Sequence, residues 1–357
     1  MAWAVSSKKG GLVSFLFALL LIGHLGLFGC EAPQSREASF AEVPIGGPLA
    51  PQGTLQSATL RSGDGVIDGD TLRAVGFDQT IRLLCVDAEE TFESDEDRDF
   101  ARRDWDSYQA QKESKSDRFG NYGTLLGEEA TAFAREFFTD GEEVFLEYQS
   151  PERTRGFFGR HLAMVWKKGE DGSWLNFNVE LVRAGLSPYF INYGRCDSYD
   201  SHFREAQREA QELRRGIWAE KSAGYRDYEE RLLSWENRAR QIDLYRRHFY
   251  NDSKVIKLGT DTTLAQLRLV VGERVIIFGA LERHAPRARP PKLHFFHRFR
   301  EDLVVIPAEG VDFEEFRIQF TPGEYYYVEG VVELYRGNPQ IKVDRRSFIR
   351  GGLTPPN

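Results

Sequence analysis

Short runs of β-forming residues, separated by turn residues, occupy two parts of this chain and limit the folds that it can adopt. The first group begins near Thr59 and consists of residues 66–67, 71–75 and 81–86, with the turn sequence Asp68-Gly69-Asp70 between its first two runs. The second group follows Leu264 and consists of residues 274–279, 303–306, 325–332 and 340–343. Short strands with glycine, proline and aspartate turns between them are typical of hairpins and of small barrels or sandwiches.

Two stretches between these groups have the periodicity of amphipathic helices. In residues 203–213, apolar residues recur at helical spacing and charges of both signs cover the opposite face. Residues 225–250 are charged, with an apolar face that consists of Tyr228, Leu232, Trp235, Ala239, Ile242 and Phe249. The sequence therefore predicts a mainly β fold with helices, of the α+β class. We expect one domain in each β-rich segment, with a helical connector at residues 221–258 that packs or spaces the two domains. The second domain, at 259–352, is expected to be a small barrel or sandwich.

Length and composition agree with two modest globular domains, because 357 residues are too many for one compact core. Hydrophobic residues make up 41% and charged residues 29%, which excludes a disordered chain, a collagen and a membrane protein with many spans. The formal net charge is −8, whereas proteins that bind nucleic acid are usually basic. Charge is unevenly distributed, however. Residues 87–106 carry a net charge of −7, and residues 283–300 contain six Arg and Lys and no acid. The acidic total is therefore no evidence against a nucleic-acid partner.

The N-terminus has the pattern of a secretory signal. Lys8 and Lys9 precede an apolar run at residues 12–28, and Gly29 directly precedes Cys30. The Gly29-Cys30 pair resembles the bacterial lipobox, which implies a signal peptide at residues 1–29 and a lipid on Cys30 that anchors an extracytoplasmic protein to the cell-envelope membrane. The alternative is a retained membrane anchor, for which this run is short against a bilayer core of about 30 Å.

Residues 30–58 are rich in Ala, Pro, Gly, Ser and Gln and are expected to form a flexible tether. Cys85 lies in the apolar run at residues 83–86, so a buried free thiol is favoured over a disulfide with Cys196.

Carboxylates cluster at two turns of the first β-rich segment. Asp70 follows the first run, and Asp87, Glu89 and Glu90 follow the third. If the two strands are neighbours, these side chains converge, and oxygen ligands of this kind suit calcium or magnesium rather than zinc. Taken alone, the Asp-Gly-Asp-Thr sequence is a weak signal and favours a solvated turn over a metal site.

The order of these and later motifs resembles the staphylococcal nuclease family. The matching segments run collinearly from about residue 59 to 220: Asp-Gly-Asp-Thr at 68–71, Ile-Arg-Leu-Leu-Cys-Val-Asp-Ala-Glu-Glu-Thr at 81–91, residues 127–133, Arg153-Thr154 with residues 159–163, residues 178–186, and residues 202–218. The resemblance implies a five-stranded barrel of the oligonucleotide-binding (OB) type decorated with three helices. It also implies calcium-dependent hydrolysis of DNA and RNA phosphodiester bonds, with little sequence preference and 3′-phosphate products.

The resemblance assigns a metal site and a catalytic set. Asp70, Asp87 and the backbone carbonyl of Ala88 match the calcium ligands. Glu90 matches the residue that orients or deprotonates the attacking water, while Arg82 and Arg160 match the arginines that hold the scissile phosphate. Guanidinium groups and a divalent cation suit this chemistry, because the transition state adds negative charge to phosphate oxygens.

Several positions depart from the family pattern. Glu89 replaces the usual proline and is expected to add a carboxylate beside the metal site, where it strengthens calcium binding or misplaces the base. Arg155 stands where an acidic residue is common, and Phe158 replaces a common tyrosine. Tyr189 and Tyr193 are candidates for stacking on bases, with surface aromatics as the alternative.

Residues 92–124 form an insert that is longer than the family usually has. We expect a charged mobile loop beside the active site, and the alternative is a segment that gates substrate or recruits additional calcium.

The last β-rich segment resembles the OB modules attached to some nucleases and polymerases, on the strength of residues 323–330 and 335–341. Basic residues in residues 283–300 are interleaved with aromatic residues, which suits tracking of a backbone and stacking on bases. The candidate contacts to nucleic acid are Arg287, Arg289, Lys292, Arg298 and Arg300. The alternative is a solvated basic hairpin whose phenylalanines fill the barrel core, and the histidines of this stretch lack the spacing of a zinc site.

We therefore expect a calcium-dependent nuclease that is monomeric and has no protein partner. The main alternative is a surface lipoprotein that binds nucleic acid without cleaving it, and the weaker one is an interaction protein that uses the fold only as a scaffold.

Overall fold

The computed structural model describes residues 49–115, 121–149, 154–156, 158–250, 252, 254–260, 262–298 and 301–356. Cys30, the signal peptide and most of the predicted tether lie outside the described residues, as does Arg300. No helix in the described ranges has both the length and the apolar character that crossing a membrane requires.

The first sheet is a closed barrel. Its strands are β1 (Leu55–Thr59), β2 (Val66–Asp68), β3 (Thr71–Leu72), β4 (Ile81–Leu83), β5 (Glu143–Glu147), β6 (His161–Lys168) and β7 (Trp174–Asn176). Neighbouring strands follow the order β1-β5-β6-β4-β3-β2, with β7 on β6. The ring closes where Leu60, just after β1, pairs with Ala74, just after β3. β4 and β6 run parallel, and the other pairs are antiparallel.

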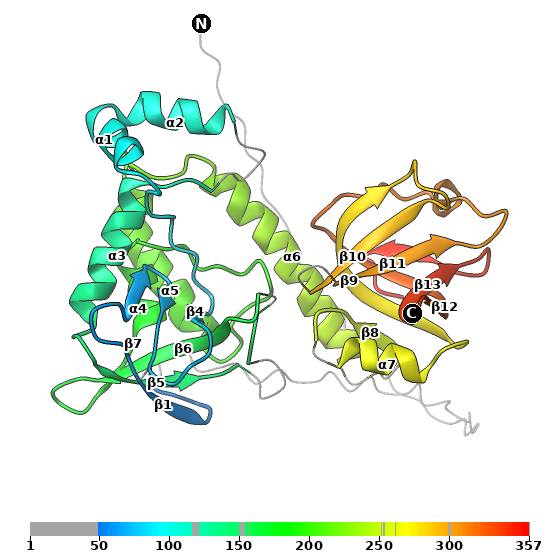
Figure 1. Ribbon diagram of the computed structural model, residues 1–357, viewed down its shortest axis with the longest axis horizontal. Helices are drawn as coiled ribbons and strands as arrows, with labels where there is room; N and C mark the ends of the chain where they lie inside the picture. The colour runs from blue at the N-terminus through cyan, green and yellow to red at the C-terminus, as the bar shows by residue number, and fades with distance from the viewer. Residues whose placement is uncertain are drawn as a thin grey trace, which may run out of the picture. The chain divides into compact units, whose positions relative to one another are not determined.

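Helices cover this barrel as predicted (Figure 1). They are α3 (Leu125–Phe137), α4 (Phe177–Arg183) and α5 (Asp200–Glu212), followed by the short 3-10 turn η1 (Gly216–Trp218). The Thr124 side chain caps the N-terminus of α3, and the Asn176 side chain caps that of α4. The predicted α+β class and OB-type barrel are confirmed.

The insert is not the predicted loop, because it contains two helices. They are α1 (Asp95–Arg103) and α2 (Trp105–Glu113), capped by the side chains of Ser94 and Asp104. Acidic residues occupy the first turn of α1, where their negative charges stabilise the helix by interacting with the positive end of its dipole. Phe92, Ala101 and Tyr108 form a small apolar cluster beneath the helices.

The predicted connector is one long helix, α6 (Tyr228–Phe249). Tyr228, Trp235 and Ala239 belong to the apolar core of the first barrel. Farther along, Ile242 and Phe249 pack in a cluster with residues of the second sheet. The apolar face read from the sequence is thus buried, and the first half of the helix is part of the first core. The domain limits themselves stay predictions.

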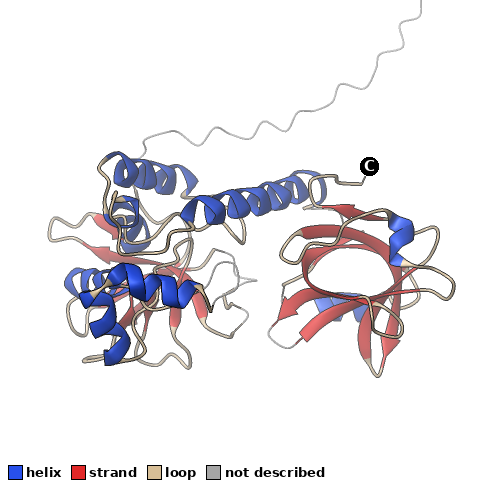
Figure 2. Ribbon diagram, turned by 90° about the horizontal axis from the view of Figure 1, so that it is seen from above, coloured by secondary structure: helices blue, strands red, loops and turns tan. Residues whose placement is uncertain are grey.

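The second sheet is also a closed barrel, seen as a ring of strands in Figure 2. Its strands are β8 (Val255–Lys257), β9 (Arg274–Ala285), β10 (Lys292–Arg298), β11 (Glu301–Pro307), β12 (Tyr325–Tyr335), β13 (Asn338–Val343) and β14 (Ile349–Gly351), accompanied by α7 (Thr263–Leu269) and η2 (Phe313–Phe316). The ring runs β9-β10-β11-β13-β12, and β12 pairs back onto β9. β11 and β13 are parallel, as β4 and β6 are in the first barrel. In both barrels the third and fifth barrel strands form this parallel pair, so the two barrels have the same strand order.

Candidate active site

A cavity of about 310 Å³ opens on the first barrel. It is lined by all six residues predicted for metal binding and catalysis, together with neighbouring loop residues: Asp70, Arg82, Asp87, Ala88, Glu90 and Arg160. The structure therefore brings together residues that lie up to 90 positions apart in the sequence.

Arg82 joins the two aspartates at the floor of the cavity. It lies in β4, and its guanidinium forms ion pairs with Asp70 through Nη1 and with Asp87 through Nη2. Asp70 is only 4% exposed and also accepts a hydrogen bond from the Ala88 backbone at 2.8 Å. Burial raises the pKa of the Asp87 carboxyl, and the charge of Arg82 opposes that shift. The two carboxylates are thus held close together beside a cation that can also contact an anionic substrate.

Strand pairing explains why the second arginine reaches the same cavity. Arg160 directly precedes β6, which runs parallel to β4, and Arg82 is opposite Leu162 in this register. Burial lowers the pKa of Arg160, and so does the charge of Arg82. Arg160 has no carboxylate ion-pair partner among the residues that the structure describes, so its guanidinium is free to bind a phosphate.

Glu90 lies at the rim, with its backbone fixed by the start of α3. Its carbonyl accepts a hydrogen bond from the Thr124 backbone at 2.9 Å. Burial raises the pKa of the Glu90 carboxyl, and the negative charges of Asp68 and Asp87 raise it further. A carboxyl with a raised pKa is a stronger base once it is ionised.

The donor set fits a hard cation. Asp70, Asp87 and the Ala88 carbonyl offer only oxygen, the ligand type that calcium prefers. Burial and mutual repulsion disfavour ionisation of the carboxylates here, and a divalent cation offsets that repulsion. Within the described ranges, no group of three or more His, Cys, Asp or Glu side chains is arranged as a metal site. The protein would therefore supply two carboxylates and a carbonyl, and water would complete the coordination.

Comparison with known proteins agrees with this geometry. The family described as staphylococcal nuclease homologue matches residues 80–220. The thermonuclease of Staphylococcus hyicus is 30% identical over 159 residues, which cover 43% of this chain and 72% of that protein. The chain belongs to the staphylococcal nuclease family. The family match spans five of the six predicted site residues, and Asp70 lies before its first residue.

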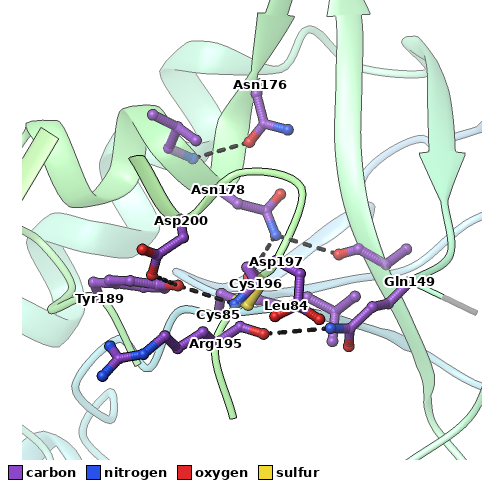
Figure 3. The surroundings of a disulfide bond; sticks show 12 residues. Leu84, Cys85, Gln149, Asn176, Asn178, Tyr189, Arg195, Cys196, Asp197 and Asp200 are labelled. Atoms are coloured by element: carbon purple, nitrogen blue, oxygen red, sulfur yellow. Dashed lines mark hydrogen bonds between the residues drawn. A yellow bond between two sulfur atoms is a disulfide. The ribbon is translucent and has the colours of Figure 1, made fainter. Parts of the chain in front are cut away.

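A disulfide links two loops beside this cavity, so the prediction of a free thiol at Cys85 is wrong. Cys85, two residues before Asp87, is bonded to Cys196 (Figure 3). The Cys85 carbonyl accepts a hydrogen bond from the Phe190 backbone at 2.9 Å, so the end of β4 and the later loop are adjacent. Ser187 Oγ also accepts from the Asp87 backbone at 2.8 Å. With Cys30 assigned to the lipid, two cysteines remain in the chain. This even number was the sequence signal that could have indicated a disulfide.

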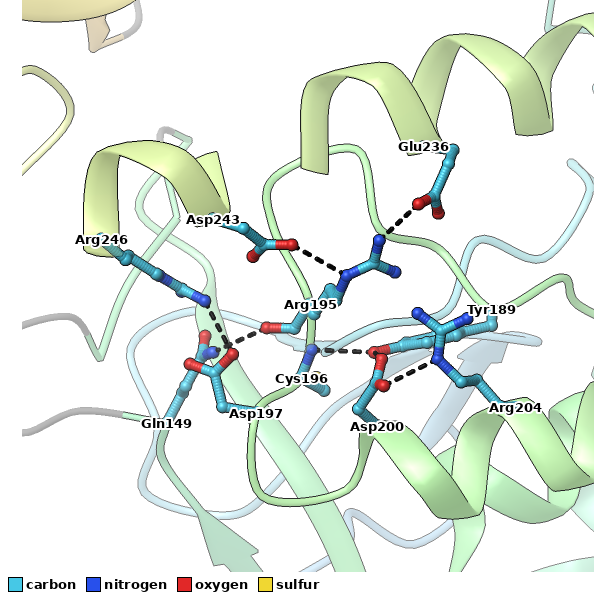
Figure 4. Close-up of polar contacts among 10 residues, drawn as sticks. All are labelled: Gln149, Tyr189, Arg195, Cys196, Asp197, Asp200, Arg204, Glu236, Asp243 and Arg246. Carbon is cyan, nitrogen blue, oxygen red and sulfur yellow. Dashed lines mark hydrogen bonds and ion pairs between the residues drawn. The ribbon is translucent and has the colours of Figure 1, made fainter. Parts of the chain in front are cut away.

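Of the two candidate tyrosines, only Tyr193 faces the cavity. Tyr189 is 3% exposed and stacks on Phe203, with ring centroids 4.8 Å apart. Its hydroxyl donates to Asp200 at 2.9 Å and accepts from the Cys196 backbone (Figure 4). The predicted base-stacking role of Tyr189 is therefore wrong, because its ring is buried against Phe203 and its hydroxyl is hydrogen-bonded inside the protein. Tyr193 is 46% exposed and lines the cavity.

The three residues that depart from the family pattern lie in different environments. Glu89 does not add a free carboxylate to the aspartate pair, because its oxygens accept hydrogen bonds from Thr124, Tyr225 and Tyr228. Arg155 forms an ion pair with Asp78 at 2.8 Å. Phe158 is 63% exposed at the cavity, where it offers an apolar face but no hydroxyl.

Of the residues of the second barrel that were predicted to contact nucleic acid, three lie at the turn between β9 and β10. Arg287 and Arg289 are exposed on the turn between β9 and β10, and Lys292 begins β10. Arg298 ends β10, but its side chain, like Arg300, lies outside the described residues. Phe295 is fully buried, so for this residue the alternative of a core phenylalanine is right.

The raised pKa of Glu90 predicts a pH dependence. A carboxylate base works only when ionised, so, with Glu90 in the role that the family resemblance implies, the rate of cleavage should rise with pH through a pKa above the usual glutamate range. Asp68→Asn removes one of the charges that raise this pKa, and we expect the acidic limb of the rate profile to move to lower pH. The measurement is the rate of cleavage against pH at saturating calcium. Asp95→Asn, at an exposed carboxylate on α1, is the control and should leave the limb in place; a limb that moves upward in Asp68→Asn would contradict this electrostatic account.

Proposed function

We propose that this protein is a calcium-dependent nuclease that hydrolyses phosphodiester bonds of DNA and RNA with little sequence preference. The observation that carries the proposal is that two arginines, two aspartates and one glutamate line a single cavity. That combination matches an anionic phosphodiester, whose transition state gathers charge on its non-bridging oxygens. The thermonuclease name of the Staphylococcus hyicus relative supports the same activity.

Each side chain has a distinct role in this proposal. Glu90 removes the proton from the attacking water, and its raised pKa makes it a stronger base than a glutamate of ordinary pKa. Arg160 contacts the phosphate, and Arg82 does so while it keeps Asp70 and Asp87 in place. Calcium, when bound by Asp70, Asp87 and the Ala88 carbonyl, supplies further positive charge to the phosphate.

The test uses labelled single-stranded DNA and RNA oligonucleotides incubated with the purified protein and calcium. We expect shorter products of both substrates that end in 3′-phosphates. Intact oligonucleotides that nevertheless bind the protein would support the alternative of a non-catalytic nucleic-acid receptor.

We also propose that the second barrel binds single-stranded nucleic acid. In OB folds, oligonucleotides bind across the second and third strands and the loops that flank them. Here those loops are the basic turn at Arg287 and Arg289 and the hairpin after β12. Tyr335, at that hairpin, is 57% exposed, and the Arg336 guanidinium lies 5.3 Å from its ring centroid. An exposed aromatic ring beside a cation suits stacking on a base.

Replacing both Arg287 and Arg289 by alanine should weaken binding of a single-stranded oligonucleotide. Each lost phosphate contact should also lower the slope of log affinity against log salt by about 0.7. Fluorescence anisotropy at several salt concentrations measures both quantities. Arg346→Ala, at an arginine that is 84% exposed elsewhere on the chain, is the control. An unchanged slope in the double variant would remove this loop from the binding surface.

We propose further that the protein acts outside the cytoplasm as a monomer, held by a lipid on Cys30. The Cys85–Cys196 disulfide supports this location, because such bonds persist mainly in oxidising compartments. Mass spectrometry of the N-terminal peptide from the membrane fraction would identify the lipid.

A further inference from the structure

A second carboxylate is buried directly beside the proposed base. Glu89 is 2% exposed and accepts three hydrogen bonds. Oε2 accepts from Thr124 Oγ1 at 2.6 Å, and Oε1 accepts from the Tyr225 backbone at 2.8 Å and from the Tyr228 hydroxyl at 2.9 Å. A buried carboxylate is tolerated only when such donors satisfy it, so these contacts hold Glu89 in one position.

Two of the three donors also hold the backbone of Glu90. The Thr124 backbone donates to the Glu90 carbonyl at 2.9 Å. The Tyr225 hydroxyl accepts from the Glu90 backbone at 3.4 Å. Both backbone groups of the base are therefore bound by residues that also bind the Glu89 side chain.

Two glycines leave the room that this arrangement needs. A Cβ at Gly224 would lie 2.5 Å from Glu89 Oε1, and a Cβ at Gly127 would lie 2.1 Å from the Glu90 carbonyl oxygen. The Gly224 carbonyl in turn accepts a hydrogen bond at 2.8 Å from Gln109, a fully buried residue of helix α2 in the insert. Helix α2 thus contacts the segment before α6 at Gly224, the residue that directly precedes the donor Tyr225.

Two donors to Glu89 lie outside the family match. The match ends at residue 220, whereas Tyr225 and Tyr228 come later in the chain. We propose that Glu89 is a positioning residue for Glu90, and that residues 224–228 complete the nuclease site by holding Glu89. This inference rests on the proposed nuclease function, with Glu90 as its base.

The experiment compares full-length Glu89→Gln and Tyr228→Phe with wild type. Glu93→Gln, at an exposed carboxylate nearby, and Tyr250→Phe, at a tyrosine that is 72% exposed, are the matched controls. We expect Glu89→Gln to lower kcat by about 10- to 100-fold with little change in KM, because a small misplacement of a catalytic group is costly. We expect a smaller decrease of kcat in Tyr228→Phe and none in the controls.

The deciding readout is the same pair of substitutions made in the Glu90→Gln background. If Glu89 acts through the base, neither substitution lowers the residual single-turnover rate further. An equal decrease in both backgrounds, or a kcat in Glu89→Gln that equals that of wild type, would overturn the positioning role. Should Glu89→Gln fail to fold, Tyr228→Phe in the two backgrounds decides alone. A wild-type protein without cleavage would instead overturn the proposed function itself.

Discussion

Glu90→Gln is expected to lower kcat for phosphodiester cleavage by about 10²- to 10⁴-fold, the usual contribution of a general base. The amide keeps the size of the side chain but cannot accept the proton of the attacking water. Because Glu90 lies at the rim and its backbone is held by Thr124, the substitution should leave the fold intact. Substrate contacts to Arg82 and Arg160 are also untouched, so KM should change little.

Rates at saturating oligonucleotide and calcium measure this effect. Glu93→Gln is the matched control, because it changes an exposed carboxylate three residues away and should cleave at the wild-type rate. A Glu90→Gln protein that cleaves as fast as wild type would show that another group is the base.

The second large effect is expected on stability, from removal of the Cys85–Cys196 disulfide. The two cysteines are 111 residues apart, so the bond closes a long loop in the unfolded chain. A cross-link over such a loop typically contributes about 3–5 kcal/mol. We therefore expect the variant with both cysteines changed to serine to lose about that much free energy of unfolding in a urea titration. Its affinity for calcium should fall as well, because Cys85 and Ser187 both constrain the segment that carries Asp87.

Reduction provides the internal control for this prediction. Dithiothreitol should lower the stability of the wild-type protein to about that of the double-serine variant and should leave the variant itself unchanged. If wild type and the double-serine variant unfold at the same urea concentration, the bridge does not stabilise the fold.

The convergence of the six predicted residues on one cavity was predictable because they belong to short, ordered motifs. Asp70 and Asp87 lie at the ends of strands whose β-forming character is local, and pairing of β4 with β6 then places Arg160 beside Arg82. Helix α5 was predictable from its sequence, because its apolar residues recur at helical spacing, whereas α3 and α4 were implied by the family resemblance.

The remaining features depend on contacts between distant residues. Glu89 looked like an additional metal ligand, because its hydrogen-bond donors are as far away as Tyr228. The run around Cys85 indicated burial correctly, but burial alone does not distinguish a thiol from a bridge whose partner arrives on a later loop. Tyr189 was placed at the surface because the sequence does not show that Phe203 packs on its ring.

The insert was wrongly predicted although its signals were local. Ser94 and Asp104 are favourable N-cap residues, and three acidic residues follow Ser94 directly. The high charge of the segment, typical of a solvated loop, outweighed these capping signals in the prediction.

The most direct test of the nuclease assignment is cleavage of a circular plasmid with calcium present, withdrawn and restored. We predict that the full-length protein nicks and linearises the plasmid in calcium, stops when a chelator is added in excess, and resumes when calcium is returned. A plasmid that stays supercoiled in calcium, or cleavage that continues unchanged in the chelator, would contradict the account.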